Sequence, residues 1–379
     1  MRDTVTYLWD TPERTRTFST AVSLHSHTHH SRESLDFLPI LAAKNPILHW
    51  AFQQQERRCT SVRPAFEEAY WTPPLTPQAA HQLESSQIES ELNLASMVSL
   101  SDHDSITAGM ELRAAGKDVP VSIEWTMPIG GIDVHVGVHN LPHQNAEMLA
   151  AEMQEYTRSP KESRLRELLA ALNEMPDVLI VLNHPLWDIS RGGTDFLPML
   201  DEALRKYNDF FHAYELNGLR SRTENDGVVE LARAWSKPLI SGGDRHGCEP
   251  NAIVNLTRAS TMSEFINEVR QDGQSHVLFL PRYRESLELR MLQAVIDVVQ
   301  KYPFHPVGEA WDERVFHPDA SGTIRPLSTL WKHPPQFIET IFAGLRIVEK
   351  SALTWNRCLS RNRESVSQQL FLRPEEEIA

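Results

Sequence analysis

Cysteine and long apolar runs are both scarce in this sequence. Its three cysteines, Cys59, Cys248 and Cys358, are far apart and form no CxxC pair, which argues against a disulfide framework and for a reducing compartment. No run of about 18 apolar residues occurs, so we expect no membrane-spanning helix. Residues 1–18 carry charges throughout and lack the apolar core of a secretory signal. Together these absences predict a cytoplasmic protein.

Positive charge is also in deficit. The 37 lysine and arginine residues face 51 aspartate and glutamate residues, which gives a formal net charge of −14. A protein that binds nucleic acid through a broad basic face is therefore not expected. Nucleic acid is disfavoured as a partner rather than excluded, because bound metal ions would reverse the sign of the charge locally.

The 379 residues suffice for one barrel of alternating strands and helices, which takes about 250 residues, together with insertions. From about Leu94 onward, apolar strand-like segments alternate with helical segments, as in βα units. Gly130 and Gly131 separate two of these strands and are typical of a hairpin turn. We therefore predict an α/β barrel domain over residues 1–280 and a helical extension over residues 281–379.

A long irregular segment interrupts the predicted barrel after its first strand. It spans residues 36–94 and includes the proline- and aromatic-rich stretch RPAFEEAYWTPPLTPQ. Insertions of this length are often lids over a binding site. The alternative is a helical excursion that packs against the outside of the barrel, and composition does not distinguish the two.

Seven predicted strands end with a His, Asp or Glu residue. Their segments read SLHSHTHH, SLSDHDS, VSIEWT, DVHVGVHN, IVLNHPLW, AYELNG and ISGGDRHG. The carboxyl ends of parallel strands lie on one rim of a barrel, where barrel enzymes carry out their chemistry. His25 and His27 are two residues apart, so on a strand both imidazoles would face the same way and could chelate one ion. Any one such residue could instead cap a helix, but the whole set predicts a metal-dependent hydrolase.

The order and spacing of these motifs resemble the PHP superfamily, which is named for polymerase and histidinol phosphatase domains. The resemblance covers roughly residues 20–275 and rests on HSH (25–27), DHD (102–104), Glu124, HVG (135–137), NHP (183–185) and GGDRH (242–246). It implies a distorted (β/α)7 TIM-like barrel, here with an insertion and a C-terminal extension. It also implies two or three divalent ions (Mn, Fe or Zn) and hydrolysis of phosphoesters.

The resemblance further implies which residues bind metal. Eight residues fall on the ligand positions of the motifs, namely His25, His27, His103, Glu124, His135, His184, Asp244 and His246. Family members often carry another ligand, Asp or His, five or six residues after the second His of HxH. Arg32 and Glu33 occupy this region here, a departure from the family pattern. Because arginine does not bind metal ions, Glu33 is the ninth candidate.

The charge of such a site favours phosphate. Three divalent ions carry six positive charges against three negative charges from Glu33, Glu124 and Asp244, while the imidazoles stay neutral. We therefore predict in-line attack of a metal-bridging hydroxide on the phosphorus of a phosphomonoester, a small nucleotide or a phosphodiester. The predicted catalytic residues are Asp102, Glu124 and His184. The predicted substrate-binding residues are Arg245, Arg220 and Asn183.

Other interpretations fit parts of the same pattern. Trp187 could stack on a substrate base or simply pack in the protein, and the arginines could be solvated at the surface. A nuclease acting on short single strands, or a PHP-like module that binds metal without catalysis, would use the same ligands. Amidohydrolase barrels also open with HxH, but the DHD motif and the closing DxH fit them less well. Substrate, metal and oligomeric state are not determined by the sequence.

Overall fold

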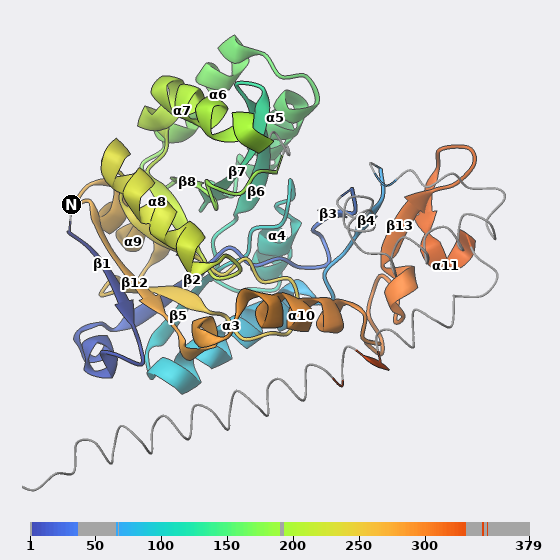
Figure 1. Ribbon diagram of the computed structural model, residues 1–379, viewed down its shortest axis with the longest axis horizontal. Coiled ribbons are helices and arrows are strands. Elements are labelled where there is room, and N and C mark those ends of the chain that lie inside the picture. Colours follow the sequence, from blue (N-terminus) through green and yellow to red (C-terminus); the bar gives the residue numbers. More distant parts are fainter. Residues whose placement is uncertain are drawn as a thin grey trace, which may run out of the picture.

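The computed structural model describes residues 2–36, 66, 68–189, 193–330, 343–344 and 347 of this chain, which folds as a mixed α/β protein (Figure 1). The first sheet has the strand order β1 (Arg2–Tyr7), β12 (Gln274–Phe279), β11 (Ile253–Thr257), β2 (Thr20–Leu24) and β5 (Ala95–Ser99). The second has the order β10 (Leu239–Gly242), β9 (Ala213–Asn217), β8 (Leu179–Leu182), β7 (Ile132–His139) and β6 (Ile123–Ile129). A small third sheet has the order β14 (Ile324–Pro326), β13 (Val315–Pro318), β4 (Tyr70–Trp71) and β3 (Glu33–Ser34).

Helices connect and cover these strands. The α-helices are α3 (Pro77–Leu92), α4 (Thr107–Ala114), α5 (Ala146–Arg158), α6 (Glu162–Asn173), α7 (Phe196–Tyr207), α8 (Arg222–Trp235), α9 (Met262–Arg270), α10 (Leu287–Val298) and α11 (Leu327–Leu330). Short 3-10 helices are η1 (Pro12–Thr17), η2 (Gly193–Asp195), η3 (Asn208–Phe210), η4 (Pro281–Arg284) and η5 (Trp311–Glu313). No helix in the described part of the chain has the length and apolar content needed to cross a membrane.

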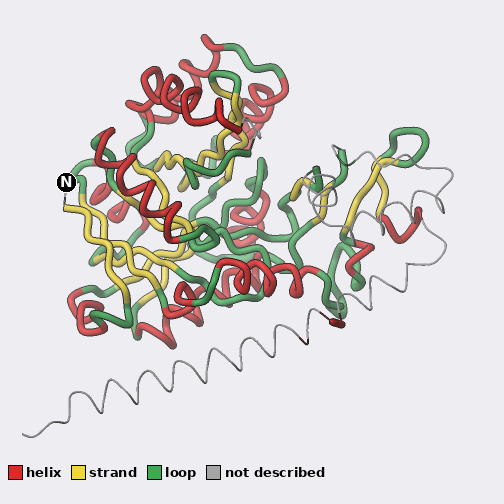
Figure 2. Tube along the Cα trace, viewed as in Figure 1, coloured by secondary structure: helices red, strands yellow, loops and turns green. Residues whose placement is uncertain are grey.

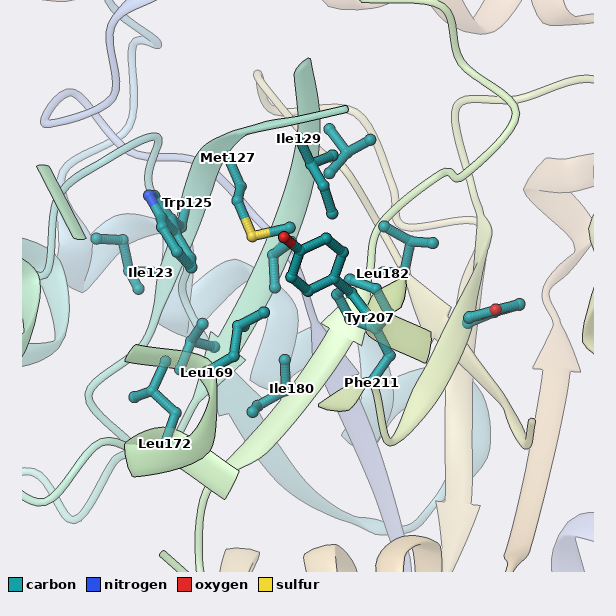
Figure 3. Close-up of a cluster of buried hydrophobic side chains, with 14 of the residues drawn as sticks. Ile123, Trp125, Met127, Ile129, Leu169, Leu172, Ile180, Leu182, Tyr207 and Phe211 are labelled. Carbon is teal, nitrogen blue, oxygen red and sulfur yellow. The ribbon is translucent and has the colours of Figure 1, made fainter. Parts of the chain in front are cut away.

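The largest part of the core lies between the second sheet and the helices α5, α6 and α7. Buried apolar side chains of β6 and β8 meet leucines of α6 and Tyr207 of α7 there (Figure 3). Trp125 of β6 is fully buried and donates its indole N–H to the hydroxyl of Thr157 in α5 at 2.9 Å. Burying this apolar area fixes the second sheet and thereby the positions of the polar residues at its ends.

The mixed α/β class is confirmed, but a closed seven-stranded barrel is not. Within the described residues the strand ladders form two separate five-stranded sheets. Two isolated parallel bridges, Ser26–Arg245 and His103–Glu124, join these sheets beyond the ends of β2 and β5. The strands are not all parallel either, because β7 runs antiparallel to β6 and β8 and β11 runs antiparallel to β2 and β12. The local reason at β7 is the hairpin expected at Gly130 and Gly131, whose φ angles are both positive, at 59° and 89°.

The segment predicted as an insertion is partly helical. Residues 77–92 form α3, which begins where the Thr76 hydroxyl accepts a hydrogen bond from the Ala79 N–H at 3.2 Å. Ala80 packs with Val98 of β5 and Leu112 of α4, so this helix covers the first sheet. Residues 37–65 and 67, where a lid was considered, lie outside the described residues.

The segment predicted as a helical extension also contains strands. Residues 287–298 form the expected helix α10, but two strands follow it, of which β13 pairs with β4 and β14 pairs with β13 in the small sheet. Figures 1 and 2 show this small sheet to one side of the two larger ones. Most of the predicted C-terminal helix, residues 334–361, lies outside the described residues.

Candidate metal centre

The carboxylate of Glu124 lies at the centre of a buried cluster of histidines. Both of its oxygens are shared, and five imidazole nitrogens lie 3.0–3.4 Å from them. Oε2 faces Nε2 of His25, Nε2 of His27 and Nδ1 of His103, whereas Oε1 faces Nδ1 of His135 and Nε2 of His184. Glu124 itself is fully buried. A single carboxylate thus contacts imidazoles that follow or belong to four different strands, β2, β5, β7 and β8.

Two further carboxylates complete the cluster. Oδ1 of Asp244 lies 3.4 Å from Nε2 of His27. Oε2 of Glu33 lies 3.3 Å from Nε2 of His103 and 3.2 Å from Nε2 of His246. The structure therefore brings all nine predicted ligands into one site, including Glu33, where the sequence departs from the family pattern.

The donor atoms form four overlapping groups that could each hold a metal ion. Within every group the atoms lie within 4.8 Å of one another. The groups are His27, Glu33, His103 and His246; His25, His27 and Asp244; His25, Glu124 and His184; and His103, Glu124 and His135. Their sharing of His25, His27, His103 and Glu124 is the pattern expected where neighbouring ions have bridging or adjacent ligands.

The residues present fit divalent cations by chemistry as well as by distance. Nε2 of His25, Nε2 of His27, Nδ1 of His103 and Oε2 of Glu124 are buried and have no hydrogen-bond partner among the described residues. Leaving such atoms unsatisfied is costly in a protein interior. A set of neutral imidazoles and carboxylates suits Mn, Fe or Zn. A metal ion would therefore satisfy buried atoms that have no hydrogen bond in the described structure.

Hydrogen bonds from outside the cluster orient two of the imidazoles. Nδ1 of His25 lies 2.7 Å from Oε2 of Glu215, and Nδ1 of His246 lies 2.8 Å from the backbone oxygen of Asp244. Both acceptors fix the proton on Nδ1, which leaves the Nε2 lone pair of each ring facing the cluster. Glu215 is the acidic residue of the segment AYELNG, and the sequence assigned it no partner. Its position two residues before the end of β9 was the local signal.

The backbone is in a rarely populated conformation at three of the nine residues. The φ angles of His25, His184 and Asp244 are 63°, 27° and 52°. Non-glycine residues adopt positive φ at an energetic cost, and such residues concentrate at functional sites. The expectation that His25 and His27 share the face of a strand is corrected here, because β2 ends at Leu24. The turn at His25, rather than strand alternation, directs both rings inward.

Two motif glycines make room for buried polar side chains. A Cβ atom on Gly137, in HVG, would lie 2.7 Å from Nε2 of His139 and 2.8 Å from Oδ1 of Asn183. A Cβ atom on Gly242, in GGDRH, would lie 1.9 Å from Oε2 of Glu215. All three distances are below those that real Cβ atoms show. These positions require glycine because of the close approach of a neighbouring side chain, not because of φ.

Electrostatics show that the site attracts positive charge. Burial by itself lowers the pKa of His103 and His246, but the neighbouring carboxylates, Glu33 above all, raise these pKa values to about 10 and about 9. Burial would raise the pKa of Glu33 and Glu124, but the surrounding imidazoles hold it well below its usual range. The carboxylates therefore stay charged and hold protons on His103 and His246 when no other cation is present.

Arg220 lies at the edge of the cluster, in contact with Asp244 and Trp187. Its Nη2 lies 3.3 Å from Oδ2 of Asp244, and its guanidinium lies 4.2 Å from the ring centroid of Trp187. The Arg220 side chain is 13 % exposed and the whole of Trp187 is 44 % exposed. This pair therefore lies where the buried cluster reaches the surface. The hypothesis that Trp187 stacks on a base is not tested, but one face of its ring is covered by Arg220.

Arg245, in contrast, points away from the site. It is 2 % exposed, and its Nη2 lies 3.1 Å from Oε1 of Glu84 on α3. Glu84 also accepts hydrogen bonds from the hydroxyls of Ser23 and Ser26. The predicted role of Arg245 in substrate binding is therefore corrected. This arginine fastens α3 to the loop that follows β10.

Two other predicted residues support the cluster from behind. Asn183 is buried and donates its Nδ2 hydrogen to Oε1 of Glu124 at 2.9 Å, so it orients this carboxylate, whereas its Oδ1 has no hydrogen-bond partner among the described residues. Asp102 is buried and accepts from the backbone N–H and the hydroxyl of Thr28, at 2.5 and 2.8 Å. Among the described residues, Asp102 belongs to none of the four donor groups. The catalytic role of Asp102 and the substrate-binding role of Asn183 stay predictions.

Comparison with known proteins assigns no family to the chain. No protein-family model and no curated protein matches it. One solved structure with some similarity is a protein of Bifidobacterium adolescentis ATCC 15703 that is provisionally described as a metal-dependent phosphoesterase. It is 13 % identical in sequence, with a TM-score of 0.31, and the match covers 53 % of this chain and 94 % of that protein's chain. PsfC of Pseudomonas syringae PB-5123 is 15 % identical with a TM-score of 0.39, over 57 % of this chain and 89 % of its own. Both likenesses are too distant to transfer a fold or an activity.

Proposed function

We propose that this protein hydrolyses a phosphoester, either a phosphomonoester or a small nucleotide or phosphodiester, with two or three divalent ions held by the nine-residue cluster. The observation that carries the proposal is the convergence of imidazole nitrogens and carboxylate oxygens on Glu124. Four overlapping donor groups surround it, and several of their buried atoms have no hydrogen bond in the described structure. Sites built to hold several adjacent cations in imidazoles and carboxylates are typical of enzymes that act on phosphoryl groups.

The charge balance supports phosphate as the ligand. Glu33, Glu124 and Asp244 contribute three negative charges. Two divalent ions would leave a net charge of about +1 and three ions about +3, with neutral imidazoles. Arg220 adds a further positive charge at the surface side. A phosphate group would therefore bind at this site although the protein as a whole is acidic.

Each side chain can be given a role in this reaction. Bound divalent ions would act as Lewis acids toward a phosphoryl oxygen and would lower the pKa of water. Glu124 would hold adjacent ions through its two oxygens, and Asn183 would keep its carboxylate in place. Arg220 would donate hydrogen bonds to a phosphoryl oxygen, because Trp187 and Asp244 hold its guanidinium at the surface side of the cluster.

The order of the strands supports a distorted barrel of the PHP type as the scaffold. The ladders run from β6 through β7, β8 and β9 to β10. The Ser26–Arg245 bridge connects the residues that follow β2 with those that follow β10. Strand β2 pairs with β5, and the His103–Glu124 bridge connects the residues that follow β5 with β6. We propose that these seven strands form one ring that is closed only at the ends carrying the cluster.

Metal analysis followed by an activity panel tests the proposal. The purified protein should bind two or three Mn, Fe or Zn ions and release phosphate or a phosphomonoester from a panel of phosphomonoesters, dinucleotides and short single-stranded oligonucleotides. Glu124→Gln should lose both metal and activity, whereas Glu230→Gln on the exposed face of α8 should lose neither. Bound metal without any hydrolysis would indicate a metal-binding module, and cleavage of oligonucleotides alone would indicate a nuclease.

A further inference from the structure

The small sheet joins three distant parts of the chain beside the cluster. Glu33 of β3 pairs with Trp71 of β4, and Trp71 pairs with Val315 of β13. Glu33, one of the nine candidate ligands, is thus connected through β4 to β13, which lies about 280 residues later in the sequence. Figure 1 shows β3, β4 and β13 side by side. The other two carboxylates do not depend on this sheet, because Glu124 is in β6 and Asp244 directly follows the loop after β10.

The C-terminal side of this connection is firmly anchored. The backbone N–H of Thr72 donates to the backbone oxygen of Arg314 at 3.0 Å. The Arg314 residue is 1 % exposed, and its guanidinium donates to four backbone oxygens of its own segment, those of Val298, Gln300, Gly308 and Glu309. Phe316 stacks on Tyr70 with ring centroids 4.8 Å apart and an interplanar angle of 16°. Residues 287–326 therefore hold β4 through backbone and side-chain contacts.

The β3–β4 ladder is too short to be stable on its own. Each strand has two residues. An isolated pair of strands is marginal in water even when longer, and further strands are needed for stability. Within the small sheet these are β13 and β14, and both belong to the C-terminal segment. The position of the Glu33 backbone thus depends on that segment. Local contacts add to it: the Leu35 N–H donates to the backbone oxygen of Ala69 at 3.0 Å, and the Ser31 hydroxyl donates to Oε1 of Glu33 at 2.7 Å.

Glu33 serves one part of the cluster only. It is the carboxylate of the group that also contains His27, His103 and His246, and it is absent from the other three donor groups found in the described residues. The ring of Trp71, its partner in the ladder, lies 5.9 Å from the ring of His246. The small sheet therefore borders Glu33 and His246, the two members of this donor group that belong to none of the other three groups in the described residues.

We infer that residues 287–326 position Glu33 and so control the occupancy of one metal position, the one formed by His27, Glu33, His103 and His246, while the remaining positions are built by the larger sheets. The inference rests on the proposed metal centre. It makes the C-terminal segment a part of the site, although none of its described residues is in a donor group. A bound ion would lose its only carboxylate if β13 no longer held β4, and affinity falls when a charged ligand is lost.

Metal stoichiometry tests the inference without reference to activity. Val315→Pro places a proline opposite Trp71 in a central strand of the small sheet, where its ring and fixed φ disturb strand pairing and proline is not tolerated. Ile324→Pro makes the same change in β14, an edge strand that is not paired with β4, and is the matched control. Glu33→Gln removes the ligand directly and serves as the reference. We expect Val315→Pro and Glu33→Gln to bind one ion fewer than the unsubstituted chain, and Ile324→Pro to bind the same number.

Extraction of metal by a chelator provides a second measurement if Val315→Pro does not fold. Release of the ion held by Glu33 requires the small sheet to open, so its rate follows the opening equilibrium. Phe316→Ala removes the stack on Tyr70, a contact of the kind that stabilises by about 0.5–1.5 kcal/mol. One ion should therefore be released about two- to tenfold faster from this variant, and the other ions at unchanged rates.

The outcomes separate this inference from the proposed function. An unsubstituted protein that binds no divalent ion would overturn the metal centre itself. A folded Val315→Pro variant with the full number of ions, or a Phe316→Ala variant with unchanged release of every ion, would overturn the role of the C-terminal segment while leaving the metal centre intact. Loss of all ions from Val315→Pro with an intact far-ultraviolet spectrum would also contradict it, because the larger sheets should keep theirs.

Discussion

Replacement of Glu215 by alanine should weaken metal binding although Glu215 belongs to none of the donor groups in the described structure. Its Oε2 accepts the Nδ1 proton of His25 at 2.7 Å and so presents Nε2 to the cluster. Loss of such a partner typically lowers metal affinity about 10–100-fold, which corresponds to about 1.4–2.7 kcal/mol. Competition with a chelator of known affinity would measure this change. Glu230→Ala, on the exposed surface, is the control.

The same loss should follow from Gly242→Ala, which leaves the carboxylate in the sequence. The added Cβ would lie 1.9 Å from Oε2 of Glu215, where ordinary contact begins near 3.4 Å, so the oxygen must move by about 1.5 Å (3.4 − 1.9). That movement breaks the bond to His25. Gly227→Ala is the matched control, because its Cβ meets only the end of the Leu186 side chain. Affinities of Glu215→Ala or Gly242→Ala within twofold of the unsubstituted protein would refute the reasoning.

Four further predictions follow from the charged residues. Metal binding should release protons, and the affinity for metal should rise from about pH 6.5 to pH 9. Imidazoles must be neutral to bind a metal, and despite burial the carboxylates raise the pKa of His103 to about 10 and of His246 to about 9. Calorimetry in buffers of different ionisation enthalpy would show the proton release, and a binding enthalpy that does not depend on the buffer would contradict it. For the same reason the metal-free protein should lose stability as the pH rises from about 6.5 through about 10, since a raised pKa in the folded state stabilises only while the group is protonated. Arg220→Ala should lower kcat/KM about 10–100-fold with unchanged metal content, as expected for the loss of a charge-assisted hydrogen bond to phosphate. Equal losses of metal and activity would instead show that Arg220 acts by positioning Asp244. Arg245→Met should destabilise the fold by about 3–5 kcal/mol in urea unfolding, because Glu84 would remain buried without its cation, whereas Arg205→Met at an exposed pair should cost under about 1 kcal/mol.

Residues with a local signal were predicted well from the sequence. The hairpin at Gly130 and Gly131 is present, because adjacent glycines allow the positive φ angles that the turn requires. All nine candidate ligands lie in one cluster, and the signal for most of them was a polar residue directly after an apolar strand. Even Glu33 is in place, although only the exclusion of Arg32 pointed to it.

Residues whose role depends on a distant partner were predicted poorly. Arg245 lies between two ligands in the sequence, yet its side chain turns away to Glu84, which is about 160 residues earlier in the chain. Asp102 and Asn183 stand in motifs of the site, but Thr28 donates to the carboxylate of Asp102, and Glu124 accepts from Nδ2 of Asn183. Neighbours in sequence do not indicate on which side of a loop a side chain finds its partner.

The sequence by itself determined which residues the site contains, because the types and spacing of ligands are local properties of strand ends. The tertiary structure alone decided how these residues are held. Positive φ at His25, the bond from His25 to Glu215 and the pairing of Glu33 through Trp71 to Val315 all depend on contacts between remote segments. Such contacts form because burial and hydrogen bonding are satisfied for the whole chain at once, and no short stretch of sequence encodes them.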